Sequence, residues 1–344
     1  MSAGSSAVVA KARCKYGKML TLSDYRLLAG KSDISYVVAT LKTLPGYKKY
    51  FSDIADNSVR RNLAEQLLYK WLFGNYIELC RFKFQKKNGF FRYLIKREEI
   101  AQIIKAIMYI SAGEHENFIL YFPMFLEKNS EVNFKELLKA ETFKEVLAAL
   151  KGTPYYKVLK PLLSDGMLFP EIRKVETVMG GHFHEWLTAT IKKEFKGKER
   201  EEVEKCVLHS ADIYNMKLCY RLKGLFKMSN EDVMRNHLPY HYRFSKKDME
   251  KLLERSDTES VDTLIRKHPY FKSCKEKENM DFETVVSYSN LNFFRERLML
   301  SQYDSVALFS LAELMTIELN NVTTIIEGIR YSIPSSEIEK MLII

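Results

Sequence analysis

One pattern occurs three times along the chain, and it constrains the fold more than any other feature. Each copy has two adjacent leucines, a stretch with helical spacing of apolar residues, and a tyrosine that follows proline or glycine. The first leucine and the tyrosine are eighteen residues apart in two copies and twenty apart in the first. The copies consist of Leu27–Leu28 with Tyr47, Leu137–Leu138 with Pro154–Tyr155, and Leu252–Leu253 with Pro269–Tyr270. A recurrence at about 110 residues predicts similar domains, because each unit can bury its apolar face only against a neighbour.

A second element occurs twice in the C-terminal part of the chain. Asp212-x-x-Asn215 and Glu318-x-x-Asn321 have the same spacing of acid and asparagine, and a later Ser-x-Glu follows both at the same offset of 106 residues. Each element opens a segment with helical spacing of apolar residues. We therefore expect a long amphipathic helix followed by a short one in both places.

The longest apolar stripe predicts a helix that ends near the last proline. Apolar residues recur at intervals of three and four from Leu308 to Ile329, which is the period of an α-helix. Pro334 should stop this helix, and Ser336 should cap a short helix after it. Only 14 of the 344 residues are glycine and 8 are proline, which favours long helices with few breaks. The fold class that we predict is all-α.

Several helix starts have the spacing of a capping box. In this motif a side-chain oxygen and an acidic residue three positions later satisfy amides that the first turn leaves free. The four candidates are Thr21 with Asp24, Thr142 with Glu145, Ser245 with Asp248, and Ser256 with Glu259.

The repeats predict three similar helical domains in a pseudo-three-fold funnel. The first domain spans residues 1–100 and includes the N-terminal segment, and we expect the C-terminal helices to complete its closing element. The second domain spans 101–210, and the third spans 211–344 with the long C-terminal helix. These boundaries follow from the period of the repeat.

No motif indicates bond chemistry or a bound cofactor. The chain lacks the glycine-rich phosphate loops and the nucleophile elbow. His182 and His184 form the densest metal-type cluster, but residues two apart lie on opposite sides of a helix. Thr188 also stands where a zinc-binding His-Glu-x-x-His motif needs its second histidine. We expect no catalytic residues, no metal and no cofactor, and we interpret the cluster as a polar helix start after Gly180–Gly181. An all-α enzyme with a loop-built site at these histidines is one alternative.

The charge leaves a second alternative open. The net charge of +10 is typical of proteins with acidic partners, such as nucleic acid, anionic membrane or an acidic protein. Between Phe82 and Lys96, five aromatic residues alternate with basic ones, as in proteins that stack on single-stranded nucleic acid. A basic all-helical nucleic-acid-binding protein is therefore the alternative function. We favour core aromatics on a helix followed by a solvated turn at Lys86 to Gly89, because no nucleic-acid module surrounds the segment.

Cysteine usage and hydropathy indicate a cytosolic location. Five cysteines form no Cys-x-x-Cys pair, which is typical of reduced thiols. No stretch reaches ~18 uninterrupted apolar residues, the length of a membrane-spanning helix. We expect a chain that does not cross a membrane by itself.

Taken together, these patterns resemble one family: the C subunit of V-type and archaeal-type ATPases, known in eukaryotes as the d subunit. The resemblance covers nearly the whole chain. It depends on Ala12–Arg13 and Met19–Leu20 near the N-terminus, the proline-tyrosine stops, and the acid-x-x-asparagine helix starts. The segment from Glu318 to Tyr331 is the most telling. The basic stretch from Lys192 to Lys205 departs from the family pattern, and we expect it in a variable connection.

The resemblance implies a function without bond chemistry. In the family, this protein links the central stalk to the membrane proteolipid ring and transmits torque between them. The implied partners are central-stalk subunits and the proteolipid ring, with peripheral membrane contact through the ring, and no nucleic acid. We expect a location on the cytoplasmic face of the membrane and no homo-oligomer.

Overall fold

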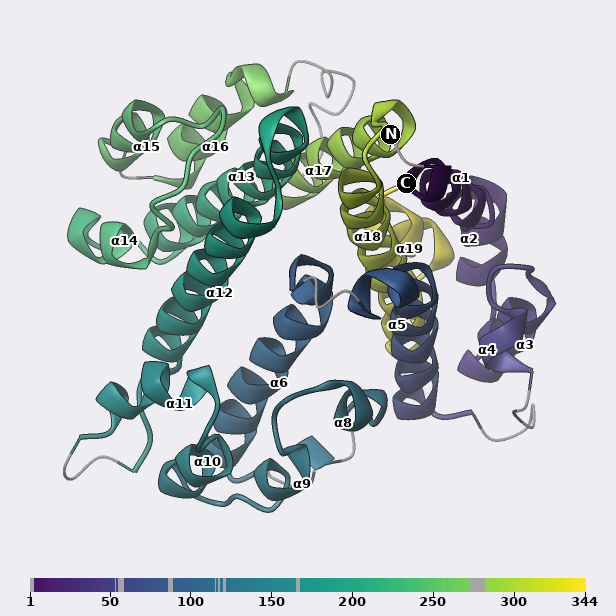
Figure 1. Cartoon of the computed structure of the whole chain (residues 1–344), viewed down its shortest axis with the longest axis horizontal. Helices are drawn as coiled ribbons and strands as arrows, with labels where there is room; N and C mark the ends of the chain where they lie inside the picture. The colour runs from purple at the N-terminus through teal and green to yellow at the C-terminus, as the bar shows by residue number, and fades with distance from the viewer. Residues whose placement is uncertain are drawn as a thin grey trace. The chain divides into compact units, whose positions relative to one another are not determined.

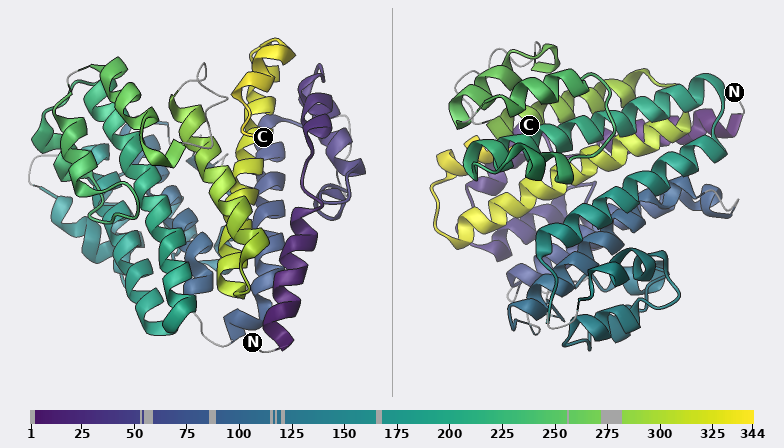
Figure 2. Two further views of the ribbon diagram at one scale, coloured as in Figure 1. Left: turned by 90° about the horizontal axis from the view of Figure 1, so that it is seen from above. Right: turned by 90° about the vertical axis from the view of Figure 1, so that its left-hand side faces the viewer.

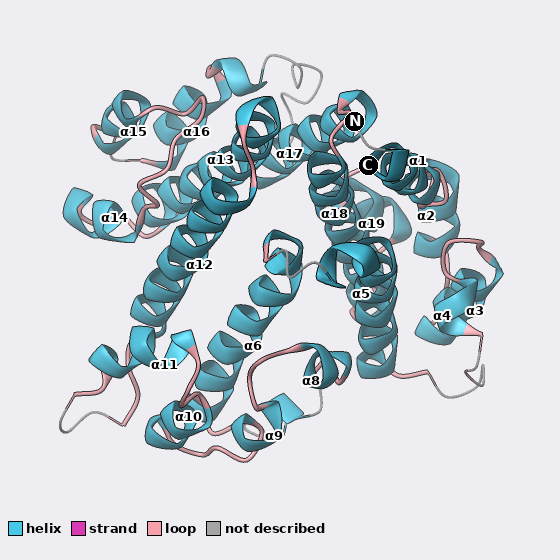
Figure 3. Cartoon of the chain, in the orientation of Figure 1, coloured by secondary structure: helices cyan, strands magenta, loops and turns pink. Residues whose placement is uncertain are grey.

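The computed structural model describes residues 3–52, 54, 59–85, 89–114, 116, 118–119, 122–164, 168–255, 257–271 and 282–344. All regular structure within these residues is helical, and none of them lies in a strand (Figure 3). The predicted all-α fold class is therefore confirmed. Glycine and proline are too scarce to interrupt most of the long helices. Five helices of 19 to 27 residues are α6 (Tyr93–Ser111), α12 (Ile172–Glu194), α13 (Gly197–Cys219), α17 (Phe282–Leu300) and α18 (Asp304–Arg330) (Figure 1).

Two compact units divide the chain. The first unit combines Met1–Gly17, Phe195–Asn321 and Glu339–Ile344, and the second combines Lys18–Glu194 with Val322–Ile338. The long helix α18 (Asp304–Arg330) and the short helix α19 (Ser335–Met341) contribute residues to both. The three domains at 1–100, 101–210 and 211–344, and their funnel arrangement, stay a prediction.

The second unit holds most of the short helices. Its described helices are α2 (Leu22–Ala29), α3 (Ile34–Thr43), α4 (Lys48–Phe51), α5 (Arg61–Gln85), α6 (Tyr93–Ser111), α8 (Phe125–Asn129), α9 (Phe134–Leu137), α10 (Phe143–Ala149), α11 (Pro154–Leu159) and α12 (Ile172–Glu194), with 3-10 turns at Phe90–Arg92 and Lys160–Leu162. Helix α6 packs along α12 (Figure 2), and α11 also packs on α12. The Glu194 carboxylate at the end of α12 accepts hydrogen bonds from the amides of Gly89 and Phe90, at 2.7 and 3.1 Å. It thereby satisfies amides that the start of the following helical segment leaves free.

The first unit is built on two long helices. Its described helices are α1 (Ala3–Tyr16), α13 (Gly197–Cys219), α14 (Asn230–Asn236), α15 (Lys246–Leu253), α16 (Thr258–Arg266) and α17 (Phe282–Leu300), with a π-helical segment at Tyr220–Leu225 that extends α13. Helix α17 packs against both α13 and α1. The Arg13 guanidinium of α1 donates to the carbonyl oxygens of Leu298 and Ser301, at 3.1 and 2.9 Å. These bonds satisfy carbonyls that the end of α17 leaves free.

Three of the four predicted capping boxes are confirmed. Thr21, Thr142 and Ser245 each accept a hydrogen bond from the amide three residues later, and the acidic side chain at that position bonds back to the N-cap amide. Ser256 of the fourth box lies outside the described residues. The predicted stop of the long C-terminal helix is also confirmed, because α18 ends at Arg330.

Three local expectations were wrong. Helix α12 runs through Gly180–Gly181 without a break, so His182 and His184 lie inside a helix and not at its start. Helix α19 begins at Ser335, which places Ser336 within its first turn instead of at the cap. The basic stretch from Lys192 to Lys205 is almost entirely helical. It covers the end of α12 and the first turns of α13, with only Phe195 and Lys196 between them.

Candidate functional site: two buried carboxylate and tyrosine clusters

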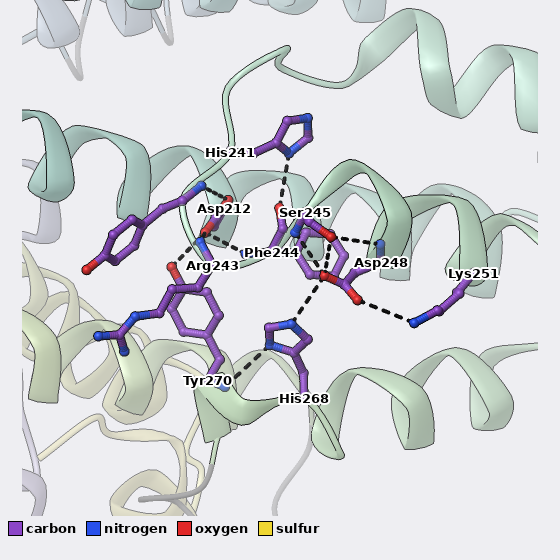
Figure 4. Close-up of polar contacts among 10 residues, drawn as sticks. Asp212, His241, Arg243, Phe244, Ser245, Asp248, Lys251, His268 and Tyr270 are labelled. Atoms are coloured by element: carbon purple, nitrogen blue, oxygen red, sulfur yellow. Dashed lines mark hydrogen bonds and ion pairs between the residues drawn. The ribbon is translucent and has the colours of Figure 1, made fainter.

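A buried carboxylate of the first unit gathers four hydrogen-bond donors. Asp212 on α13 is fully buried. Its Oδ1 accepts from the amide of Tyr242 at 3.0 Å, and its Oδ2 accepts from the amides of Arg243 and Phe244 at 2.8 and 3.0 Å. The hydroxyl of Tyr270 donates to the same Oδ2 at 2.7 Å (Figure 4). One side chain thus holds the loop before α15 and the tyrosine of the third repeat, and we call this group the Asp212 cluster.

His209 completes the Asp212 cluster one turn earlier on α13. Its ring stacks on Phe293 with centroids 3.7 Å apart, and its Nδ1 lies 3.1 Å from the Tyr270 hydroxyl oxygen. Burial lowers the pKa of His209 to about 3, so the ring is neutral at physiological pH. Because Tyr270 gives its single proton to Asp212, His209 must donate its Nδ1 proton to the Tyr270 oxygen. The three side chains form one directed chain of hydrogen bonds.

The pKa shifts of Asp212 and Tyr270 follow from their burial and their contacts. Burial raises the pKa of Asp212, and the hydrogen bonds from Phe244 and the other donors offset this rise only in part. Burial and the adjacent Asp212 charge raise the pKa of Tyr270, so this hydroxyl keeps its proton. Oδ2 of Asp212 accepts three of the four hydrogen bonds and Oδ1 accepts one, and all four donors belong to the chain itself. The arrangement fastens the loop at Tyr242, Arg243 and Phe244 to α13.

A second network next to the cluster fixes the start of α15. His268 accepts a hydrogen bond from the amide of Tyr270 at its Nδ1, 3.3 Å away, so its Nε2 carries the proton. That Nε2 lies 3.5 Å from Oδ2 of Asp248, the carboxylate that also accepts from the Ser245 hydroxyl at 2.6 Å (Figure 4). The Ser245 capping box is thereby tied to the tyrosine stop of the same repeat.

The second unit repeats this arrangement around Glu99. Glu99 on α6 is fully buried. Its Oε1 accepts from the Ser130 hydroxyl at 2.6 Å and the Glu131 amide at 3.2 Å, and its Oε2 accepts from the Tyr155 hydroxyl at 2.5 Å. Burial and the adjacent Glu99 charge raise the pKa of Tyr155, which therefore donates. We call this group the Glu99 cluster.

The tyrosine of the first repeat is also buried, but glycine precedes it instead of proline. Tyr47 stacks on Trp71 with centroids 4.8 Å apart, and the Trp71 indole donates to the Gly46 carbonyl oxygen at 3.0 Å. A Cβ atom on Gly46 would lie 2.5 Å from the carbonyl oxygen of Lys18. This close approach of two backbone segments explains the glycine in the first copy.

Two asparagines bracket backbone in the same way. Asn215 donates to the Leu238 carbonyl at 2.9 Å and accepts from the Leu238 amide at 2.8 Å. Asn321 donates to the Ile343 carbonyl at 2.7 Å and accepts from the Ile343 amide at 2.9 Å. In each case one asparagine side chain satisfies both the amide and the carbonyl of a residue 23 or 22 positions later, as a neighbouring strand would do in a sheet. Glu318, the acid that precedes Asn321, is buried.

The repeat tyrosines and most of the repeat leucines fall on the core, with one shift of register, whereas Pro154 and Pro269 are exposed. Leu28, Leu137 and Leu252 are fully buried, whereas Leu27 is 50% exposed. Burial therefore aligns Leu28, and not Leu27, with the first leucine of the other pairs. Among the second leucines, Leu253 is buried and Leu138 is half-buried. Pro154 occupies the first turn of α11, where its missing amide costs nothing, and Pro269 opens the turn that leads to Tyr270.

Comparison with known proteins identifies the family. The family model vATP-synt_AC39, described as ATP synthase (C/AC39) subunit, matches residues 8–341. The chain belongs to this family. A curated relative, the C subunit of the A-type ATP synthase from Methanosphaera stadtmanae, is 24% identical over 356 aligned positions, which cover 97% of this chain and 86% of the archaeal protein. The family resemblance predicted from the repeats is confirmed.

The features behind the alternative functions have structural roles in this member of the C/AC39 family. Phe90, Phe91 and Tyr93 are buried, so they are not available to stack on nucleic-acid bases, and the side chains of Phe82 and Phe84 lie outside the described ones. His184 bonds to the Gly180 carbonyl of its own helix at 3.0 Å, while His182 lies edge-on to Tyr155. Within the described ranges, no group of three histidine, cysteine or acidic side chains converges on a metal position.

The sequence analysis missed Asp212 and Glu99 as partners of the repeat tyrosines, although the sequence of this C/AC39 family member carries a signal for them. Glu99-x-x-Gln102 has the same acid and amide spacing as Asp212-x-x-Asn215 and lies at the matching place in the second repeat. The acid precedes the repeat tyrosine by fifty-six residues in one case and fifty-eight in the other. Gln102 bonds to Glu98 and not to distant backbone, so the two copies of the motif share only part of their structure.

Proposed function

We propose that the chain is a non-catalytic coupling subunit of an A/V-type ATPase, which joins the central stalk to the membrane proteolipid ring and transmits torque between them. The observation that carries this proposal is the family match over residues 8–341, with a relative named as part of an A-type ATP synthase. The partners that we propose are the central-stalk subunits and the proteolipid ring. The proposed location is the cytoplasmic face of the membrane.

The internal construction suits such a role. A torque-transmitting element must resist deformation, and densely packed helices transmit strain well. The Asp212 and Glu99 clusters lock a long helix to the segments after it through charge-assisted hydrogen bonds, which are stronger than neutral ones. Among the residues that the structure describes, no helix is both long and apolar enough to cross a membrane. Contact with the membrane would then be peripheral, through the ring and lipid surface.

Affinity purification from native membranes tests the assignment. The tagged chain should recover headpiece, stalk and proteolipid subunits from mild detergent. A matched control is the same chain with Asp212 replaced by alanine, which breaks the Asp212 cluster and should lower recovery. Recovery of RNA-associated proteins in place of ATPase subunits would instead support the nucleic-acid alternative.

A further inference from the structure

The ends of the three long helices that carry the buried acids follow one design. Each ends at a residue with left-handed φ, and the amide after that residue reaches back to an earlier carbonyl. The left-handed residues are Gly113 after α6, Lys227 after α13 and its π-helical segment, and Ser332 after α18, with φ values of 72°, 51° and 56°.

One of these ends contains an additional residue. The closing bond spans five residues in two helices, from Glu114 to Tyr109 and from Ile333 to Gly328, but six in the third, from Met228 to Leu222. The buried acid likewise precedes the left-handed residue by fourteen positions in α6 and α18, but by fifteen in α13, from Asp212 to Lys227. The third helix accommodates this residue as the π-helical segment Tyr220–Leu225. A π-helical turn is rare and is found mainly at functional sites.

The extra residue changes what this helix end exposes. Leu222 and Gly224 face inward and are buried, and the π-helical segment packs on α16. Leu225 and Phe226 are 53% and 68% exposed. Two adjacent large apolar side chains at a helix end cost solvation free energy. Lys227 adds strain, because left-handed φ is unfavourable for a residue with a Cβ atom.

Positive charge flanks this pair. Arg221 pairs with Glu283 at 2.9 Å, and Arg235 lies 3.5 and 3.8 Å from Glu231 and Asp232. These three acids therefore have cationic partners. Lys223 bonds to the neutral side chain of Asn230, and neither Lys223 nor Lys227 has an ion pair with any described residue. This helix end thus combines two exposed apolar side chains with two lysines that form no ion pair within the part of the chain that the structure describes.

We propose that this π-turn tip, formed by Lys223, Leu225, Phe226 and Lys227, binds an anionic lipid surface. Leu225 and Phe226 would enter the boundary between headgroups and acyl chains, and the two lysines would contact anionic headgroups. Apolar side chains flanked by basic ones are the pattern of interfacial membrane binding. The physiological meaning of this contact rests on the proposed function, which brings the chain to a membrane, but the lipid affinity itself belongs to the isolated chain.

Vesicle co-sedimentation of the purified full-length chain tests the proposal. The chain should bind phosphatidylcholine vesicles that contain one third phosphatidylserine, bind pure phosphatidylcholine vesicles far less, and dissociate at high salt. The double variant L225S/F226S should bind at least tenfold more weakly. Replacing Lys223 or Lys227 by glutamine should weaken binding about fivefold each, since one basic residue near the surface contributes about 1 kcal/mol.

Matched variants separate the tip from general surface effects. Leu300→Ser removes another leucine that is 71% exposed in the same unit, and it should leave vesicle binding unchanged. Phe226→Trp should add a tryptophan whose fluorescence shifts to the blue with anionic vesicles, and Leu300→Trp should show no such shift. Circular dichroism checks that each variant is folded.

Two results would overturn the proposal: no binding of the wild-type chain to anionic vesicles at low salt, or equal binding by L225S/F226S. If L225S/F226S lost ATPase subunits from affinity purification while its vesicle binding stayed normal, the tip would be a protein contact instead. Failure of the wild-type chain to recover ATPase subunits, with tip-dependent vesicle binding intact, would refute the proposed function and leave the lipid site standing.

Discussion

Replacing Tyr270 by phenylalanine tests the Asp212 cluster most sharply. The substitution removes one hydroxyl and leaves the ring in place. Asp212 then loses one of its four donors, and the Nδ1 proton of His209 loses its acceptor 3.1 Å away. Both groups are buried, so water cannot readily replace the lost bonds.

The expected cost follows from these two losses. A hydrogen bond to a charged group contributes about 1.5–3 kcal/mol, and a buried donor left without a partner costs about 1–3 kcal/mol. Because the ring can shift slightly to relieve part of the cost, we expect Tyr270→Phe to lower the free energy of unfolding by about 2–4 kcal/mol. Tyr155→Phe in the Glu99 cluster should cost less, about 1.5–3 kcal/mol, because no described histidine donates a hydrogen bond to the Tyr155 hydroxyl, and His182 contacts only its ring.

Hydrogen exchange provides a local readout and urea unfolding a global one. The amides of Tyr242, Arg243 and Phe244 donate to Asp212, so their protection should fall about tenfold for each 1.4 kcal/mol lost. The control is Tyr36→Phe, at a tyrosine that is 60% exposed, which should change stability by less than about 0.5 kcal/mol. If Tyr270→Phe behaved like Tyr36→Phe and left these amides protected, the hydroxyl would not be part of the clamp.

Three further outcomes follow from named contacts. The free energy of unfolding should fall as the pH drops below 6.5, by up to about 1.4 kcal/mol per pH unit, because the folded pKa of His209 is about 3 and the ring binds a proton only in the unfolded chain. His209→Gln should flatten this slope in urea titrations at pH 7 and 5.5. An unchanged slope would contradict the assignment to His209. Gly46→Ala should lower the free energy of unfolding by about 1–3 kcal/mol, because the new Cβ would lie 2.5 Å from the Lys18 carbonyl oxygen. Gly180→Ala lies in mid-helix with nothing within 4 Å of its Cβ, so it should be neutral or stabilising by about 0.5–1 kcal/mol. Similar effects of the two substitutions on thermal melting would refute the steric argument. Asn321→Asp should lower the free energy of unfolding in urea by about 2–3 kcal/mol, since a carboxylate oxygen would face the Ile343 carbonyl oxygen to which the amide now donates. An unchanged free energy of unfolding would show that the bonds between Asn321 and Ile343 do not stabilise the fold.

The helical class of the fold and several helix starts could be predicted from the sequence. Helix type and the caps at Thr21, Thr142 and Ser245 depend on residues within one turn of each other, so local chemistry suffices to predict them. The tyrosines at 155 and 270 were recognised as repeat positions because proline precedes them. Their hydroxyl partners were not recognised, because the acids lie more than fifty residues away and only the folded chain brings them together.

Other features depend on tertiary packing and could not be predicted from the sequence. Leu27 and Leu28 are identical in type, and only the packing of α2 decides which is buried. Gly180–Gly181 predicts a break, yet the surrounding contacts of α12 keep the helix intact, since propensity is a weak prior. The π-helical segment depends on a one-residue difference between repeats that share little sequence, and it becomes visible only when the helix ends are compared.

The central claim is the coupling role, and proton or sodium pumping by native membrane vesicles tests it most directly. ATP hydrolysis and ATP-driven ion uptake are measured together in vesicles from cells that contain or lack this chain, and in vesicles from cells in which the chain is restored. The account predicts that ion uptake is lost without the chain, while hydrolysis persists in the detached headpiece, and that restoration recovers uptake. Unchanged ion uptake per ATP hydrolysed in the absence of the chain would contradict it.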